Sequence, residues 1–223
     1  MYIKNQDAIP SEMVYNNSKF TNGNEIVNGF AKYFSSTYKN INLNLNNHDI
    51  CNNCIILNNI VINEIDMINA FKEINFNTAP GPDKIHPKFI KNTGLNISIP
   101  LLYIFRKSIS TGIFPNQWKA SFITPIHKSG NKNMINNYRP ITIINVFAKL
   151  FECIIYKKVL SHLNQYFIIE QHGSLEKKSI ETNLLTFKED IIDNFINNSR
   201  TYAIYTDVKK AFDTINHKLE TLY

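Results

Sequence analysis

A stretch of closely spaced prolines in the first half of the chain restricts the fold more than any other feature of the sequence. It reads Thr78-Ala-Pro-Gly-Pro-Asp-Lys-Ile-His-Pro87. Each proline fixes its own φ angle and lacks a backbone N–H donor, so we predict a loop here rather than regular structure. The chain has 223 residues, of which 43% are hydrophobic. It can therefore form one large domain or two small ones around this loop.

Apolar residues at helical spacing predict five helices. Asn63 and Asn145 are suitable N-caps for two of them. Pro100 is suited to the first turn of another, which Gly112 is placed to end. The predicted helices cover about residues 25–38, 63–74, 100–112, 145–165 and 180–196.

Two β-favouring runs, residues 119–127 and 138–144, flank a polar loop at 129–133. This arrangement predicts an antiparallel hairpin with Lys128 and Arg139 near its arms. A third run of aromatic and β-branched residues covers 201–208 and predicts a strand that carries Asp207 at its carboxyl end.

The chain is mildly basic, with a formal net charge of +6. This surplus suits a polyanionic partner such as nucleic acid but does not require one. The excess of asparagine, lysine and isoleucine has an equally simple explanation in an AT-rich coding sequence. Composition alone therefore does not identify a function.

The cysteines predict neither disulfides nor a metal site. Cys51 and Cys54 form a Cys-x-x-Cys pair, but no second Cys or His pair follows at the spacing of a zinc site. We interpret them and Cys153 as reduced, intracellular thiols. The sequence has no apolar signal core and no run of roughly 18 apolar residues that would cross a bilayer, so we expect neither secretion nor membrane insertion.

Asp207 is the residue whose placement most strongly suggests chemistry. A carboxylate at the end of a strand is a rigidly held oxygen ligand, and Mg²⁺ prefers hard oxygen ligands. Nucleotidyl transfer uses two such ions to stabilise the attacking and the leaving oxygen. The alternative is an aspartate that caps a helix or forms a turn. One carboxylate cannot hold two ions by itself.

The chain resembles reverse transcriptases of non-LTR retrotransposons (LINE-type, jockey/RTE-like). The segment Asp207-Val-Lys-Lys-Ala-Phe-Asp213 is similar to the first palm motif of that family. Further similar segments occur in the family's order, together covering about residues 60–217. They are Asn77–Ile85, Gly112–Lys119, Thr124–Lys128, Asn137–Ile141 and Lys149–Glu152.

The resemblance implies roles for the residues around Asp207. Asp207 would be the catalytic ligand of Mg²⁺, and the carbonyl of Val208 a further ligand at the nucleotide site. Phe212 would exclude the 2′-hydroxyl of a ribonucleotide, the alternative being an ordinary core phenylalanine. Asp213 is expected to hold the turn rather than to bind metal.

We predict roles for four cations, of which Arg139 and Lys128 lie in segments that resemble family motifs and Lys84 and Lys88 lie beside the proline-rich loop. Arg139 and Lys128 would contact the triphosphate of the incoming nucleotide, since a guanidinium grips phosphate oxygens bidentately and an ammonium acts as a point charge. Lys84 and Lys88 would touch the template backbone. Considered without the family, each of these side chains is an ordinary surface cation.

The implied fold is α+β: the fingers of a right-hand polymerase, helix-rich around a small hairpin, followed by an incomplete palm. Residues 1–60 would be a polar lead-in arm with one helix, 61–200 the fingers region, and 201–223 the start of the palm. The implied partners are an RNA template, a DNA primer and deoxynucleoside triphosphates, with two Mg²⁺ ions as cofactor. No membrane and no obligate protein partner are expected. The protein would be nuclear if it belongs to an active element.

The sequence departs from the family in two places. After Gln171-His-Gly173 the residues Ser174, Glu176 and Ile180 replace the usual pattern, and the motif with adjacent aspartates is absent before Tyr223. We therefore expect that this chain alone does not polymerise DNA. Two alternatives stay open beside a polymerase: a non-catalytic nucleic-acid-binding module, and the inert remnant of a decayed element.

Overall fold

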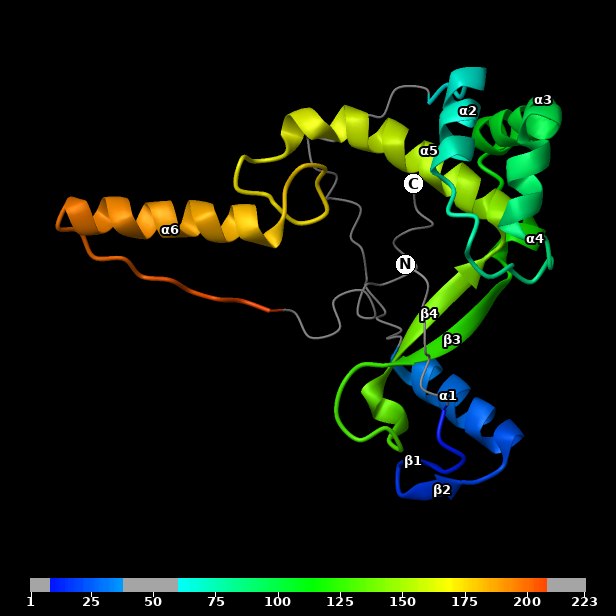
Figure 1. The fold of residues 1–223 in the computed structure, drawn as a ribbon, viewed down its shortest axis with the longest axis horizontal. Coiled ribbons are helices and arrows are strands. Elements are labelled where there is room, and N and C mark those ends of the chain that lie inside the picture. The colour runs from blue at the N-terminus through cyan, green and yellow to red at the C-terminus, as the bar shows by residue number, and fades with distance from the viewer. Residues whose placement is uncertain (1–8, 38–59, 208–223) are drawn as a thin grey trace, which may run out of the picture. The chain divides into compact units, whose positions relative to one another are not determined.

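The computed structural model describes residues 9–37 and 60–207 (Figure 1). Its contacts divide the chain into two units, one that runs as far as Lys158 and one that begins at Val159. The described part is helix-rich and contains two small antiparallel hairpins, in agreement with the α+β class predicted from the sequence. No helix among these residues is long and apolar enough to span a membrane.

The main core of the first unit lies among the helices α2 (Glu64–Glu73), α3 (Pro87–Thr111), α4 (Asn116–Lys119) and α5 (Val146–Leu163). Phe105 of α3 is fully buried at its centre. Its ring lies 5.5 Å from that of Trp118 and 5.0 Å from that of Phe151, both in edge-to-face geometry. The other fully buried residues of this core are Ile62, Met67, Ile90 and Leu150.

The predicted N-caps of α2 and α5 are confirmed. The Asn63 side chain accepts a hydrogen bond from the Asp66 N–H at 2.9 Å, and the Asp66 carboxylate accepts one from the Asn63 N–H at 2.8 Å. Asn145 is buried, and its side chain accepts from the Ala148 N–H at 2.8 Å. Its amide also donates to the Gln117 carbonyl, so this cap ties α5 to α4. Both caps satisfy backbone donors that a helix cannot pair within itself.

The helix that ends at Gly112 starts earlier than predicted. It begins at Pro87 behind an N-cap at His86, and Pro100 lies in its interior rather than in its first turn. Pro87 suits the first turn of a helix because the N–H that proline lacks would have no partner there. The predicted end is correct, because Gly112 adopts the left-handed conformation with φ of 66°.

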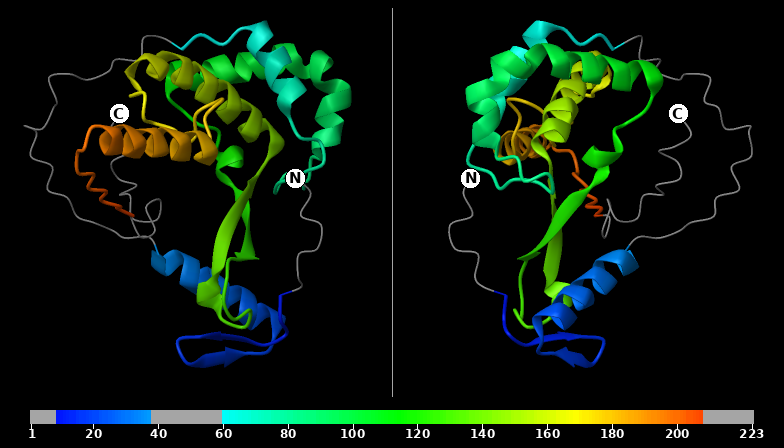
Figure 2. Two further views of the ribbon diagram at one scale, coloured as in Figure 1. Left: turned by 60° about the vertical axis from the view of Figure 1, so that its left-hand side comes forward. Right: turned by 90° about the vertical axis from the view of Figure 1, so that its right-hand side faces the viewer.

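The predicted hairpin is confirmed as β3 (Ser121–His127) and β4 (Tyr138–Ile144), paired antiparallel with Ser121 opposite Ile144 and His127 opposite Tyr138. The base of the hairpin continues directly into α5 through Asn145. The tip carries a short 3₁₀ helix, η1 (Ile135–Asn137). Figure 2 shows the hairpin from two sides, with the main helices at its base and α1 at its tip.

Residues 9–37 form a second core around the hairpin tip. The predicted helix is present as α1 (Gly23–Thr37), preceded by an unpredicted hairpin of β1 (Met13–Tyr15) and β2 (Ser18–Phe20). The Val14 N–H donates to the Asn133 carbonyl at 2.7 Å, which links β1 to the tip loop. The buried residues of this second core are Met13, Tyr15, Ile26, Phe30, Phe34, Ile135 and Tyr138.

The second unit consists mainly of the 3₁₀ helix η2 (Asn164–Tyr166) and the helix α6 (Ile180–Ile196), whose N-cap is Ser179. The expected strand at 201–208 is wrong for its described part, because residues 201–207 have no regular structure. The segment runs back beside α6, with the Tyr205 ring 6.3 Å from that of Phe187 (Figure 1). A strand exists only where a neighbour completes its hydrogen bonds, and the described residues provide none here.

Candidate nucleic-acid interface

Two predicted nucleotide-binding cations lie together at the tip end of the β3–β4 hairpin. Arg139 stands opposite Ile126 in the strand register. Lys128 follows β3 directly, and its N–H donates to the Asn137 carbonyl at 2.8 Å. Both side chains are exposed, and neither forms a salt bridge with a described residue. The hairpin therefore presents two cations, a guanidinium and an ammonium, that are available to phosphate groups.

One face of the hairpin connects Arg139 with the hairpin base. Residues directly opposite each other in an antiparallel pair point to the same face, and every second residue along a strand repeats it. Arg139 therefore shares a face with the opposite pair Thr124 and Ile141, and with the next pair, Phe122 and Ile143. Phe122 and Ile141 are about half exposed, at 51% and 45%. This half-apolar face is not covered by the main core.

A pocket of about 720 Å³ opens at the base of that face. One wall is the loop at residues 74–81, which leads into the proline-rich stretch, and another is the hairpin base with Thr124 and residues 141–144. The first two turns of α5 supply Lys149 and Glu152. Burial raises the pKa of the Glu152 carboxyl above its ordinary value.

Gly81 makes this arrangement possible. A Cβ atom at this position would lie 2.6 Å from both the Cα and the N of Asn145, and 2.8 Å from the carbonyl carbon of Ile144. Only a residue without a side chain lets the loop approach the junction of β4 and α5 so closely. The loop predicted from the sequence thus packs directly on the backbone of Asn145, the N-cap of α5.

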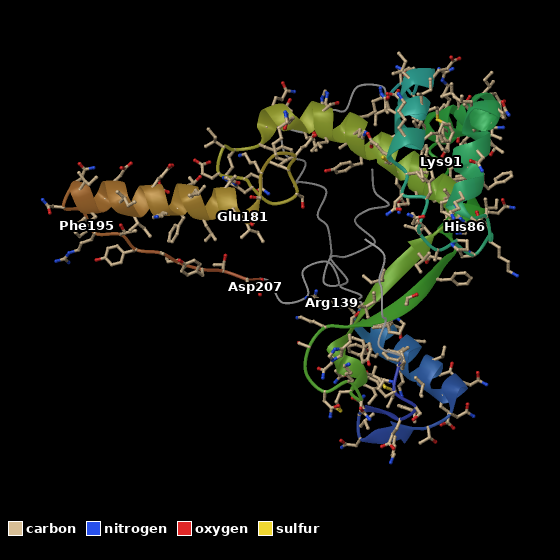
Figure 3. The ribbon with its side chains drawn as sticks, in the orientation of Figure 1. His86, Lys91, Arg139, Glu181, Phe195 and Asp207 are labelled. Atoms are coloured by element: carbon tan, nitrogen blue, oxygen red, sulfur yellow. The ribbon has the colours of Figure 1, made fainter. Side chains whose placement is uncertain are left out.

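The two predicted template-contacting lysines lie at the other end of the same loop. Lys84 is exposed and adopts the left-handed conformation with φ of 60°. Lys88 is exposed in the first turn of α3, where its N–H donates to Nδ1 of His86 at 3.2 Å. Lys91, one turn further along, lies over the Phe76 ring at 4.4 Å from its centroid. Figure 3 marks His86 and Lys91 together with Arg139. Both predicted lysines are thus accessible, but no contact assigns them a ligand.

Asp207, the predicted catalytic residue, belongs to the second unit, whereas Lys128 and Arg139 belong to the first. It is exposed at the end of the segment beside α6 (Figure 3). Val208 and Phe212 lie outside the described residues, as do Cys51, Cys54 and Asp213. No three His, Cys, Asp or Glu side chains among the described residues come together as a metal site. Asp207 is thus a suitable hard ligand that does not form a metal site by itself.

The pocket residues carry no signal in the sequence that predicts a cavity. Lys149 and Glu152 are the first and last residues of the Lys-Leu-Phe-Glu segment that resembles a family motif, yet nothing in that segment indicates a cavity. Asn75, Asn77 and Thr78 precede the proline-rich stretch and also line the pocket. These residues come together only in the folded chain, because they are separated by about seventy positions.

Curated relatives of this chain are polymerases of mobile elements, although no protein-family model matches it. It is 24% identical over 155 residues to the probable RNA-directed DNA polymerase from transposon BS of Drosophila melanogaster, a match that covers 68% of this chain. It is 25% identical over 160 residues to the RNA-directed DNA polymerase from mobile element jockey of the same organism. The identity is 28% over 145 residues with the retrovirus-related Pol polyprotein from type-1 retrotransposable element R2 of Popillia japonica.

These matches extend over about two thirds of the chain but over only 16% to 19% of each relative. They agree with the resemblance that the segments from Asn77 to Asp213 carry. The homologues of this chain are RNA-directed DNA polymerases of non-LTR retrotransposons.

Proposed function

We propose that this chain is part of an RNA-directed DNA polymerase, in which residues 61–200 form the fingers and residues 201–223 begin the palm. The observation that carries the proposal is the match of about two thirds of the chain to polymerases of mobile elements. The exposed cations on the β3–β4 hairpin support it, because a polymerase must hold a triphosphate and a nucleic-acid backbone. If the element is active, the protein acts on nuclear DNA.

In this proposal the substrates are the RNA template, the DNA primer and a deoxynucleoside triphosphate, and the hairpin and the first palm motif each contribute residues that bind them. Arg139 and Lys128 bind the triphosphate, and Lys84 and Lys88 contact the template. Phe212 selects deoxynucleotides against ribonucleotides. The charges and the exposure of the four cations fit these roles. Their geometry around a substrate follows only from the family.

Asp207, with the Val208 carbonyl, is proposed as a ligand of Mg²⁺. Two bound ions would stabilise the attacking primer oxygen and the leaving pyrophosphate. The described residues contain a single carboxylate for this purpose and no metal-binding cluster, so they do not complete such a site. The remaining ligands must come from other residues.

We expect the purified 223-residue chain to show no primer extension on an RNA template in the presence of Mg²⁺ and all four deoxynucleotides, because one carboxylate cannot hold both ions. Incorporation of a labelled nucleotide is the measurement, and Asp207→Asn is the matched control for a contaminating polymerase. Extension by the unaltered chain that Asp207→Asn abolishes would contradict the expectation.

A second candidate function is nucleic-acid binding without catalysis, favoured by the two exposed hairpin cations. We expect Lys128→Gln with Arg139→Gln to lower the affinity for a fluorescein-labelled single-stranded RNA on the order of 10-fold at 0.1 M salt, and to reduce the slope of log K against log salt by about 1.4, or about 0.7 per lost phosphate contact. Fluorescence anisotropy across a salt series measures both quantities.

The matched control for this pair is Lys72→Gln with Lys107→Gln. It removes the same charge from exposed positions on α2 and α3. An equal loss in both double variants would mean that net charge, not the hairpin, governs binding. Binding that does not respond to Mg²⁺ or to Asp207→Ala favours the non-catalytic module, and the absence of salt-dependent binding favours the inert remnant.

A further inference from the structure

The pocket at the hairpin base has the chemistry of a site for a flat, neutral heterocycle. Its apolar lining includes Ile74 and Val146, which are buried residues of the main core, and Pro87. Its polar lining includes the residues Asn77 and Thr78. A nucleobase has two apolar faces and a rim of hydrogen-bond donors and acceptors, and such mixed pockets of roughly 300–1,000 Å³ bind small organic groups.

The charges in the pocket argue against a phosphate group as its occupant. Lys149 and Glu152 lie three residues apart on α5 and bring opposite charges to the same lining. A surplus of positive charge favours a phosphate group, and the hairpin tip provides one with Lys128 and Arg139. The pocket instead offers one cationic donor and one carboxyl group, which suit the edge of a base.

The hairpin face links the pocket to the phosphate-binding cations. Arg139 and Ile141 are two residues apart on β4 and point to the same face, and Ile141 lines the pocket. Two residues of a strand span about 7 Å. A strand whose phosphate is held at Arg139 therefore needs to extend along this face by only a short distance for a base to enter the pocket.

We propose that this pocket binds one unstacked base of the single-stranded nucleic acid whose backbone contacts Arg139. The inference rests on the second candidate function, in which the exposed hairpin cations bind a nucleic-acid backbone rather than a nucleoside triphosphate. It adds a base-binding site formed by the loop at 74–81, the hairpin base and α5. Proteins that hold single strands contact the faces of unstacked bases as well as the charged backbone, and contacts to a base edge add a preference for particular bases.

The test compares two labelled strands of equal length and charge, a short RNA and a strand in which every base is replaced by an abasic spacer. We expect the full 223-residue chain to bind the RNA at least about 5-fold more tightly at one salt concentration, since burying the apolar faces of a base contributes to affinity independently of phosphate contacts. The salt slopes of the two strands should be equal. Equal affinities for the two strands would overturn the proposal.

A pocket-filling substitution locates the effect. Ala79 is exposed and lines the pocket, so Ala79→Leu should remove the preference for RNA over the abasic strand while leaving the affinity for the abasic strand unchanged. Ala120→Leu, at an exposed position outside the lining, is the matched control and should retain the preference. A variant that fails to fold would lose its affinity for both strands, whereas a variant with a blocked pocket would lose only the preference for RNA.

Crosslinking with RNA that contains 4-thiouridine gives an independent result. Crosslinks within residues 74–81 or 141–152 support the pocket, and crosslinks confined to the hairpin tip overturn it. If both strands bind equally and Lys128→Gln with Arg139→Gln weakens both, the pocket proposal fails and nucleic-acid binding by the hairpin stands. If neither strand binds, both fail.

Discussion

Replacing Phe105 by alanine is expected to lower the free energy of unfolding of the chain by about 3–5 kcal/mol. Phe105 is fully buried. Its ring meets those of Trp118 and Phe151 edge to face, so the substitution removes buried apolar surface and leaves a cavity that its aromatic neighbours cannot fill without losing their own contacts.

Urea unfolding followed by tryptophan fluorescence measures this change, because Trp118 is the only tryptophan of the chain and belongs to the same cluster. Tyr103→Ala is the matched control. It removes an aromatic ring from the same helix at a position that is 68% exposed, and its effect should stay within about 0.5 kcal/mol. Similar losses in the two variants would mean that the main core does not determine the stability that the fluorescence reports.

Gly81→Ala is expected to lower the free energy of unfolding by about 1–3 kcal/mol, the usual cost of placing extra atoms in a packed site. The added Cβ would meet the Asn145 backbone at 2.6 Å, and backbone cannot rotate away as a side chain can. The substitution should also disturb the Asn145 cap, which holds the Ala148 N–H and reaches the Gln117 carbonyl.

Gly23→Ala provides the comparison, since no atom lies within 4 Å of the Cβ that it would add. Thermal unfolding monitored by circular dichroism should show a lower melting temperature for Gly81→Ala and little change for Gly23→Ala. Equal melting temperatures would show that the loop at residues 74–81 moves away from α5 at negligible cost.

The sequence predicts a helix or strand where a capping residue, a turn residue or a regular spacing of apolar residues marks it. Asn63 and Asn145 cap the helices expected to follow them, and Gly112 ends α3. The sequence does not predict where α3 begins, because Pro87 and Pro100 are both compatible with the first turn of a helix. The turns that precede Pro100 pack on the main core through Ile90, and this contact is not visible in the sequence. The β1–β2 hairpin has a readable signal in Asn16-Asn17, whose positive φ angles of 49° and 62° asparagine tolerates in tight turns.

The candidate site is predictable only in part. Lys128 and Arg139 follow from a hairpin and from family motifs, and the structure brings them together on it. The pocket does not follow, because it depends on the approach of Gly81 to Asn145 across more than sixty residues. The unpaired segment at 201–207 shows the same limit, since β propensity favours an extended chain but cannot provide the neighbouring strand.

The packing at the hairpin tip has a consequence for how firmly the two cations are held. A two-stranded ribbon alone is only marginally stable in water. Here it is supported at both ends, by the main helices at its base and by Phe30 and Met13, which pack with Tyr138 at its tip. Residues 9–37 contain none of the segments that resemble the polymerase family. They nevertheless help to determine the position of Arg139. A chain that lacked residues 9–37 would keep every segment that resembles the family, but the tip of the β3–β4 ribbon that carries Arg139 would lose its support.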